Sequence, residues 1–165
     1  MSQQDDDING LVGDLMRLGT VEQVDLALGI ATVRSGDVIS PALPWMEAAG
    51  SWRTWSPPSV GEQVLLLCPE GDIAAAVILR GLYSTAFPKL GADAHPRFDG
   101  PSGLNITFTE DGITIAAPSG LAITGDVTIT GQLTASVDVI GGGKSLKGHK
   151  HGGVQAGGAQ TGTPV

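Results

Sequence analysis

The chain has 165 residues and a net charge of −8 at pH 7, with 25 glycines, 10 prolines and only 4% aromatic residues. The acidic balance disfavours a nucleic-acid-binding protein, because such proteins need cations to neutralise phosphates. No run of apolar residues approaches the roughly 18 that a membrane-spanning helix requires. The single cysteine, Cys68, excludes an internal disulfide, so we expect the fold to depend on short strands, a repeat or partner chains.

The N-terminal segment, residues 1–19, is predicted to form a short helix. Its apolar residues are spaced at i, i+3, i+4, i+7 and i+8 from Ile8 to Met16, which is typical of one helix face, and Gly19 is expected to end the helix. The run of aspartates from Asp5 to Asp7 favours a helix N-terminus. A signal peptide would be basic and then apolar, so we expect a chain that is made in the cytoplasm without one.

Residues 20–85 are predicted to form an OB-fold barrel. Five short β-prone runs are separated by turn residues, which is typical of a small Greek-key barrel of this type. Trp45, Trp52 and Trp55 lie in this segment and could stack on nucleic-acid bases, which is a known use of the barrel. Because Arg53 is the only cation among them, packing in the core or at an interface is the favoured interpretation.

After a predicted linker at residues 86–102, which contains three prolines, residues 103–141 have the most regular pattern of the chain. Apolar and polar residues alternate in short runs punctuated by glycine, so each predicted strand is apolar on one face only. Such strands cannot close a core alone, because the apolar face needs a surface opposite it. Three copies wound about one axis would turn these faces inward, which predicts an intertwined homotrimeric β-helix stalk. The apolar positions are Leu104, Ile106, Phe108, Ile113, Ile115, Leu121, Ile123, Val127, Ile129, Val137 and Val139.

Residues 142–165 are predicted to form the tip, and they contain His149 and His151 with Lys150 between them. In an extended chain, residues i and i+2 point to the same side, so the two imidazoles can meet at one point. One chain offers no third ligand nearby, and a solvated terminal stretch is the alternative interpretation. Three copies on a threefold axis would supply six imidazole nitrogens, an octahedral shell. Such a shell favours iron(II) or nickel(II) over zinc, which prefers four ligands, and iron is the more available metal.

The order of these parts resembles the baseplate assembly protein V family, which forms the central spike of contractile phage tails and of related tailocin particles. The resemblance rests on the N-terminal helix, on AAAVILRGLYSTAFP at the end of the barrel, on GPSGLNITF at the start of the stalk, and on the tip HKHGGVQAGGAQTGTPV. It implies a homotrimer in which His149 and His151 of three chains hold one iron ion per trimer. It also implies a virion protein whose tip pierces the bacterial outer membrane.

The expected fold is therefore all-β with a short N-terminal helix, followed by an OB-fold barrel, a trimeric β-helix stalk and a metal-capped tip. The helix and the barrel are expected to dock on the tail tube or on baseplate hub proteins. No enzymatic activity is predicted, because the chain has no lysozyme-like insertion of the kind that some larger spikes carry. Nickel or zinc at the apex, and calcium or chloride in the stalk, stay open as alternatives.

Two other functions compete with that of a spike. A metalloenzyme at the histidine cluster is disfavoured, because six histidines would leave no open coordination position and the tail contains no carboxylate. A trimeric tail-fibre-like adhesin is the stronger alternative, although a receptor-binding tip should present aromatic residues and none follows Phe108. The basic tip residues Lys144, Lys147 and Lys150 suit either contact with an anionic envelope or simple solubility.

Overall fold

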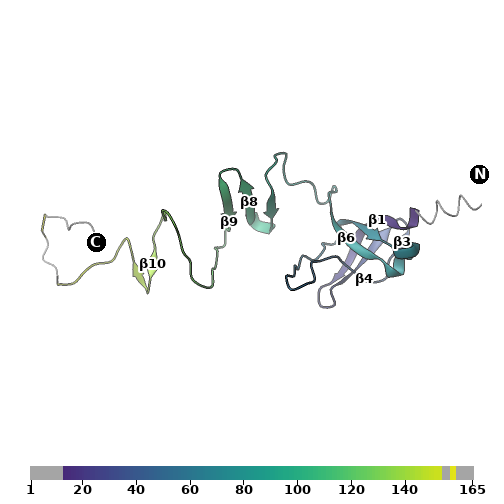
Figure 1. The fold of residues 1–165 in the computed structure, drawn as a ribbon, viewed down its shortest axis with the longest axis horizontal. Coiled ribbons are helices and arrows are strands. Elements are labelled where there is room, and N and C mark those ends of the chain that lie inside the picture. The colour runs from purple at the N-terminus through teal and green to yellow at the C-terminus, as the bar shows by residue number, and fades with distance from the viewer. Residues whose placement is uncertain (1–12, 154–156, 159–165) are drawn as a thin grey trace, which may run out of the picture. The chain divides into compact units, whose positions relative to one another are not determined.

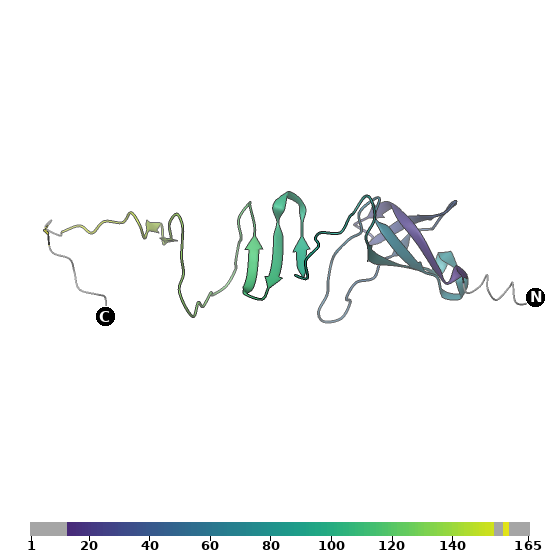
Figure 2. The ribbon, with the colours of Figure 1, turned by 90° about the horizontal axis from the view of Figure 1, so that it is seen from above.

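The computed structural model describes residues 13–153 and 157–158 of the chain. It divides into two units, Met1–Pro118 and Ser119–Val165. Figure 1 and Figure 2 show two sheets in the first unit and a single small hairpin in the second. Among the described residues, no helix has both the length and the apolar character needed to cross a bilayer.

The first sheet has the strand order β3-β2-β1-β5-β6, and β4 also pairs with β2. Beyond β4, Trp45 forms a parallel bridge with Ile78 of β6, and the Met46 amide donates to the Ile78 carbonyl at 2.9 Å. This contact joins the two ends of the sheet, so the strands wrap around one core as in a small barrel (Figure 1). The strands are β1 (Met16–Asp25), β2 (Ile30–Ser35), β3 (Val38–Ile39), β4 (Leu43–Pro44), β5 (Gln63–Leu67) and β6 (Val77–Leu82).

The barrel core follows from alternation along the strands. In β5, Val64 and Leu66 are fully buried whereas Leu67 is 41% exposed, and in β2 every second residue points inward in the same way. Cys68 lies in this core with a raised pKa caused by burial, as expected for a thiol packed as a small apolar residue. The core consists of Val21, Ala31, Val33, Leu43, Trp45, Val64, Leu66, Cys68, Ala76 and Ile78.

Most of the predicted N-terminal helix, residues 1–12, lies outside the described residues, and in the described part of this segment only Gly13 and Asp14 are helical. The segment from Met16 onward forms β1 instead. Met16 to Thr20 pair with Leu67 to Gln63, so backbone pairing with β5 overrides the helical spacing of the side chains. Gly19 does not end a helix but allows close packing, because a Cβ there would lie 2.4 Å from Cγ1 of Val33.

Two short 3-10 helices, η1 (Pro69–Gly71) and η2 (Ile73–Ala75), connect β5 to β6. A third, η3 (Pro101–Gly103), precedes the second sheet, which has the order β7-β8-β9. The strands of this sheet are β7 (Arg97–Asp99), β8 (Asn105–Thr109) and β9 (Gly112–Ala116). The three residues of β7 fit between Pro96 and Pro101, inside the range that was expected to be a linker because prolines would interrupt any strand pairing.

The second sheet is apolar on one face only. Ile106 pairs with Ile115 and Phe108 with Ile113, whereas Thr107 pairs with Thr114 on the opposite face. Phe98 extends the apolar face through its pairing with Ile106 and is 71% exposed. Nothing within the described residues covers this face, since Ile113 and Ile115 are also at least half exposed. The alternation predicted for these strands is therefore present, and its apolar side is open to solvent.

The second unit contains one hairpin, β10 (Ile140–Gly141) and β11 (Lys144–Ser145). Its turn is Gly142-Gly143, and both residues have positive φ angles, 54° and 75°, which only glycine adopts without strain. Residues 119–139 form no strand in the single chain, and their alternating apolar side chains are exposed. These exposed residues are Leu121, Ile123, Val127, Ile129, Leu133, Val137 and Val139.

Candidate metal centre

The two tip histidines predicted as metal ligands lie side by side. The ring centroids of His149 and His151 are 5.0 Å apart, with an angle of 80° between the ring planes. Both residues are exposed, so neither imidazole is used in a core. The structure thus brings together the pair that the i, i+2 spacing predicted, and the two rings can occupy neighbouring positions of one coordination shell.

The ring of His149 is held by two backbone carbonyls. Its Nδ1 lies 2.9 Å from the Leu146 carbonyl oxygen and 3.1 Å from that of Ser145. A carbonyl oxygen can only accept, so the proton of the neutral imidazole belongs on Nδ1. The lone pair of the neutral ring then resides on Nε2. This is the arrangement by which a second set of contacts orients a metal-binding histidine.

A compact turn, residues 138–149, places His149 at its end. The Asp138 carboxylate accepts hydrogen bonds from the backbone amides of Val139, at 2.8 Å, and Lys147, at 3.1 Å. The Leu146 amide donates to the Val139 carbonyl at 2.8 Å, which closes the turn around the β10–β11 hairpin. Ser145 adds a further contact, because its hydroxyl accepts from the Gly148 amide at 2.7 Å.

This donor set fits a metal that prefers imidazole nitrogen, such as iron, nickel or zinc. One chain, however, supplies two ligands, and the described residues contain no group of three or more metal-binding side chains. A complete shell at His149 and His151 therefore needs ligands from further chains. Ligation by these two residues stays a prediction.

The sequence interpretation missed the residues that orient the ligands. Asp138 and Ser145 are single polar residues near a glycine run, and only the Gly-Gly turn signal at residues 142–143 could have suggested that the chain folds back there.

One of the three tryptophans of the barrel lies in the core, and the other two are exposed. Trp45 is 7% exposed in the core, Trp55 packs against it with ring centroids 5.3 Å apart, and Trp52 is 92% exposed.

Known protein families match this chain at the barrel and at the tip. Residues 17–83 match the family described as type VI secretion system/phage-baseplate injector OB domain, which confirms the OB-fold prediction. Residues 145–165 match the GpV apex motif, which begins at Ser145 and includes both histidines. The spike protein of Escherichia phage P2 is 37% identical over 131 residues, which cover 77% of this chain and 60% of that relative.

These matches confirm the resemblance to the phage baseplate assembly protein V family that the sequence predicted, at the barrel and at the tip. Because the chain spans about 60% of the length of the curated relative that it matches, the comparison supports this resemblance and not the activity of the whole protein. The family matches at the barrel and at the tip leave residues 84–144 between them, which include the one-sided strands.

The turn that orients His149 should depend on pH through Asp138. Hydrogen bonds from the Ser145 hydroxyl and the Lys147 amide hold the pKa of this carboxyl below its usual range. Because the folded pKa is lowered, the carboxylate stabilises the turn above about pH 3.9, the ordinary Asp pKa, and this stabilisation is lost as the pH falls through the lowered pKa. The amide chemical shifts of Val139 and Lys147, followed by NMR, should titrate together with a midpoint below the ordinary value. A midpoint at or above that value would contradict the hydrogen-bonded turn.

Proposed function

We propose that this chain is the central spike of a contractile phage tail or tailocin baseplate, a rigid homotrimeric needle with an iron-capped tip that is driven through the bacterial outer membrane. The family matches at the barrel and the tip and the 37% identity to a protein named spike protein in phage P2 support this function. The observation that carries the proposal is the uncovered apolar face that recurs from β7 to the tip. The protein acts mechanically and as part of the virion.

The homotrimer is supported by the amount of apolar surface that one chain leaves exposed. Phe98 is 71% exposed on β7, Ile113 is 64% exposed on β9, and Val137 of the second unit is 78% exposed. Burial of such side chains contributes about 1.5–3 kcal/mol each, and within either unit the described residues form no second layer that buries them. Three copies that turn these faces to a common axis would form the β-helix stalk, with threonine, asparagine and aspartate outward.

The metal cap is supported by the two adjacent rings and by the Nδ1 contacts of His149. Three chains would contribute six imidazole nitrogens, and the bound ion would tie the ends of the chains to one point. Iron is the proposed metal, with nickel or zinc as alternatives, because imidazole binds all three and six equivalent nitrogens fit iron and nickel best. Calcium or chloride in the stalk stays an open alternative.

Penetration would proceed with the C-terminal tip leading. The barrel is the part of the family that is described as an injector OB domain, so it is the end proposed to dock on the tail tube or baseplate hub. The tip segment from Lys144 to Gly153 has lysines, glycines and histidines at its surface and no large aromatic residue other than the imidazoles. A tip without large aromatic side chains suits penetration better than receptor binding. An adhesin, the alternative function, would need such side chains to anchor its receptor.

Metal analysis of the purified protein should find about one iron per three chains. Replacing both ligands, His149→Ala with His151→Ala, should abolish metal binding while the trimer persists, because the apolar burial lies in the stalk. His95→Ala is the matched control, since His95 is exposed in the first unit and outside the tip, and it should leave the iron content unchanged. One metal ion in every chain, or a tetrahedral zinc site, would contradict the shared octahedral shell.

Particles that carry a spike without residues 142–165 test the mechanical role. They should assemble and contract normally, because the barrel and most of the stalk are intact, but they should kill or infect poorly. The double histidine variant in the same particles separates loss of the metal from loss of the whole tip. Full activity of the truncated particles would show that the tip is not the piercing element.

A further inference from the structure

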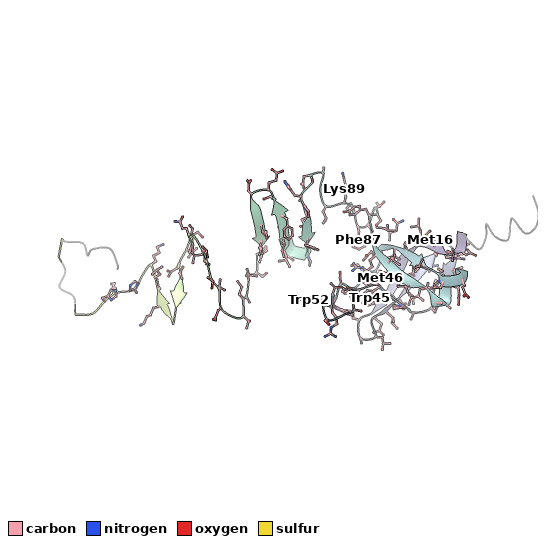
Figure 3. All side chains as sticks on the ribbon, viewed as in Figure 1. Met16, Trp45, Met46, Trp52, Phe87 and Lys89 are labelled. Atoms are coloured by element: carbon pink, nitrogen blue, oxygen red, sulfur yellow. The ribbon has the colours of Figure 1, made fainter. Side chains whose placement is uncertain are left out.

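A hairpin-like loop projects from the barrel between β4 and β5 and carries Trp52 at its end. Ala49 and Arg53 form an antiparallel bridge, and the Thr54 amide donates to the Ala48 carbonyl at 3.1 Å. Trp52 lies in the turn of this loop and is 92% exposed (Figure 3). An indole so exposed on an ordered loop has no role in the fold of its own barrel.

The Glu47 carboxylate holds this loop in shape. It accepts hydrogen bonds from the Thr54 hydroxyl, from the Ser56 amide at 2.5 Å and from Nε1 of the buried Trp45 at 3.1 Å. The Thr54 hydroxyl is the main reason that the pKa of Glu47 lies below its usual range. One carboxylate therefore links both arms of the loop to a core residue.

A second carboxylate fixes the end of the loop to the sheet. Glu62, which is 7% exposed, makes two hydrogen bonds of 3.0 Å with the Arg80 guanidinium of β6 and accepts from the Ser59 amide at 2.9 Å. Arg80 also donates to the Ser56 hydroxyl at 2.7 Å. Because the loop is ordered by these contacts before it meets a partner, little conformational entropy is lost when Trp52 binds.

The same barrel has an open pocket of about 620 Å³ beside the β1–β2 hairpin. Its lining is mostly apolar, with Val24, Leu26 and Ile30 among the contributing side chains, and Asp25 is its only charged residue. Leu26 is 59% exposed at its rim. Trp52 does not fill this pocket in its own chain, since the indole is almost fully exposed.

The Trp52 loop and the β1–β2 pocket carry opposite charges. Arg53, next to Trp52, is the only charged residue from Ala48 to Gly61, and it forms no ion pair within the part of the chain that the structure describes. The Asp25 carboxylate caps the hairpin by accepting from the Ala27 and Leu28 amides through Oδ1. Its second oxygen, Oδ2, accepts no hydrogen bond within the described residues.

We propose that Trp52 of one protomer inserts into the β1–β2 pocket of the next protomer, with Arg53 paired to Asp25 across the contact. This inference rests on the homotrimer of the proposed function and assigns its interface in the barrel. The two surfaces differ, so the contact is head-to-tail, and a threefold rotation closes it into a ring in which every loop and every pocket is used. A buried indole removes roughly 150–250 Å² from water, as expected for the anchor residue of an interface.

Cross-linking in the full chain tests the contact. The variant Asp25→Cys with Arg53→Cys, treated under native conditions with a short bismaleimide linker, should give a covalent trimer on a denaturing gel, because each chain links to two neighbours. A linker is used because an Arg–Asp pair separates the two Cα atoms by more than a disulfide spans. Cys68 is fully buried and should not react. Asp37→Cys with Arg53→Cys is the matched control, since Asp37 is exposed on the β2–β3 turn, and it should give no linked species.

The variants Arg53→Asp and Asp25→Arg provide a second measurement by thermal unfolding. Each charge reversal alone should lower the melting temperature of the barrel, and their combination should restore it in part. Three outcomes would overturn the inference. They are a link between positions 25 and 53 of the same chain, a link formed by Arg53→Cys alone, and a native trimer in which no link between positions 25 and 53 forms. In the last case the spike proposal would stand, whereas a monomeric native mass would overturn both.

Discussion

The structure depends on one constraint, namely that the strands after the barrel have an apolar face that no other described part of their own unit covers. In the β7–β9 sheet, Ile106, Phe108 and their partners form a continuous apolar side, and the alternation continues into a segment that forms no strand by itself. In the proposed trimer, the other chains supply the backbone pairing and the side-chain burial that this segment lacks. On that proposal the stalk folds only as the trimer assembles.

The barrel does not share this dependence, since its ten core residues are buried within one chain. In the proposed trimer, the barrel would serve as the base from which three stalk segments extend. The contacts of Glu47 and Glu62 order the outward-facing loop, which leaves Trp52 for the proposed intermolecular contact. In the second unit, the turn closed by Asp138 presents two adjacent imidazoles.

The sequence predicted the features that depend on the periodicity of apolar residues. It did not predict those that depend on pairing between segments far apart in the chain. Alternation identified the barrel strands and the one-sided β8 and β9, and the spacing of His149 and His151 predicted adjacent rings. The helical spacing from Ile8 to Met16 was misleading beyond Leu15, because pairing with β5 and the close approach at Gly19 place Met16 in a strand. The roles of Asp138 and Glu47 were not predictable, since single carboxylates in loops carry no pattern and their partners lie up to nine residues away.

The mass of the full chain in solution tests the central claim most directly. Sedimentation equilibrium should give three times the chain mass of 16.8 kDa at all accessible concentrations, and the same value after a chelator has removed the tip metal. Persistence without metal is expected because the apolar faces of the stalk, and not the ion, drive association. A monomeric mass under native conditions would contradict the account, since the exposed faces from Phe98 to Val139 would then have no partner.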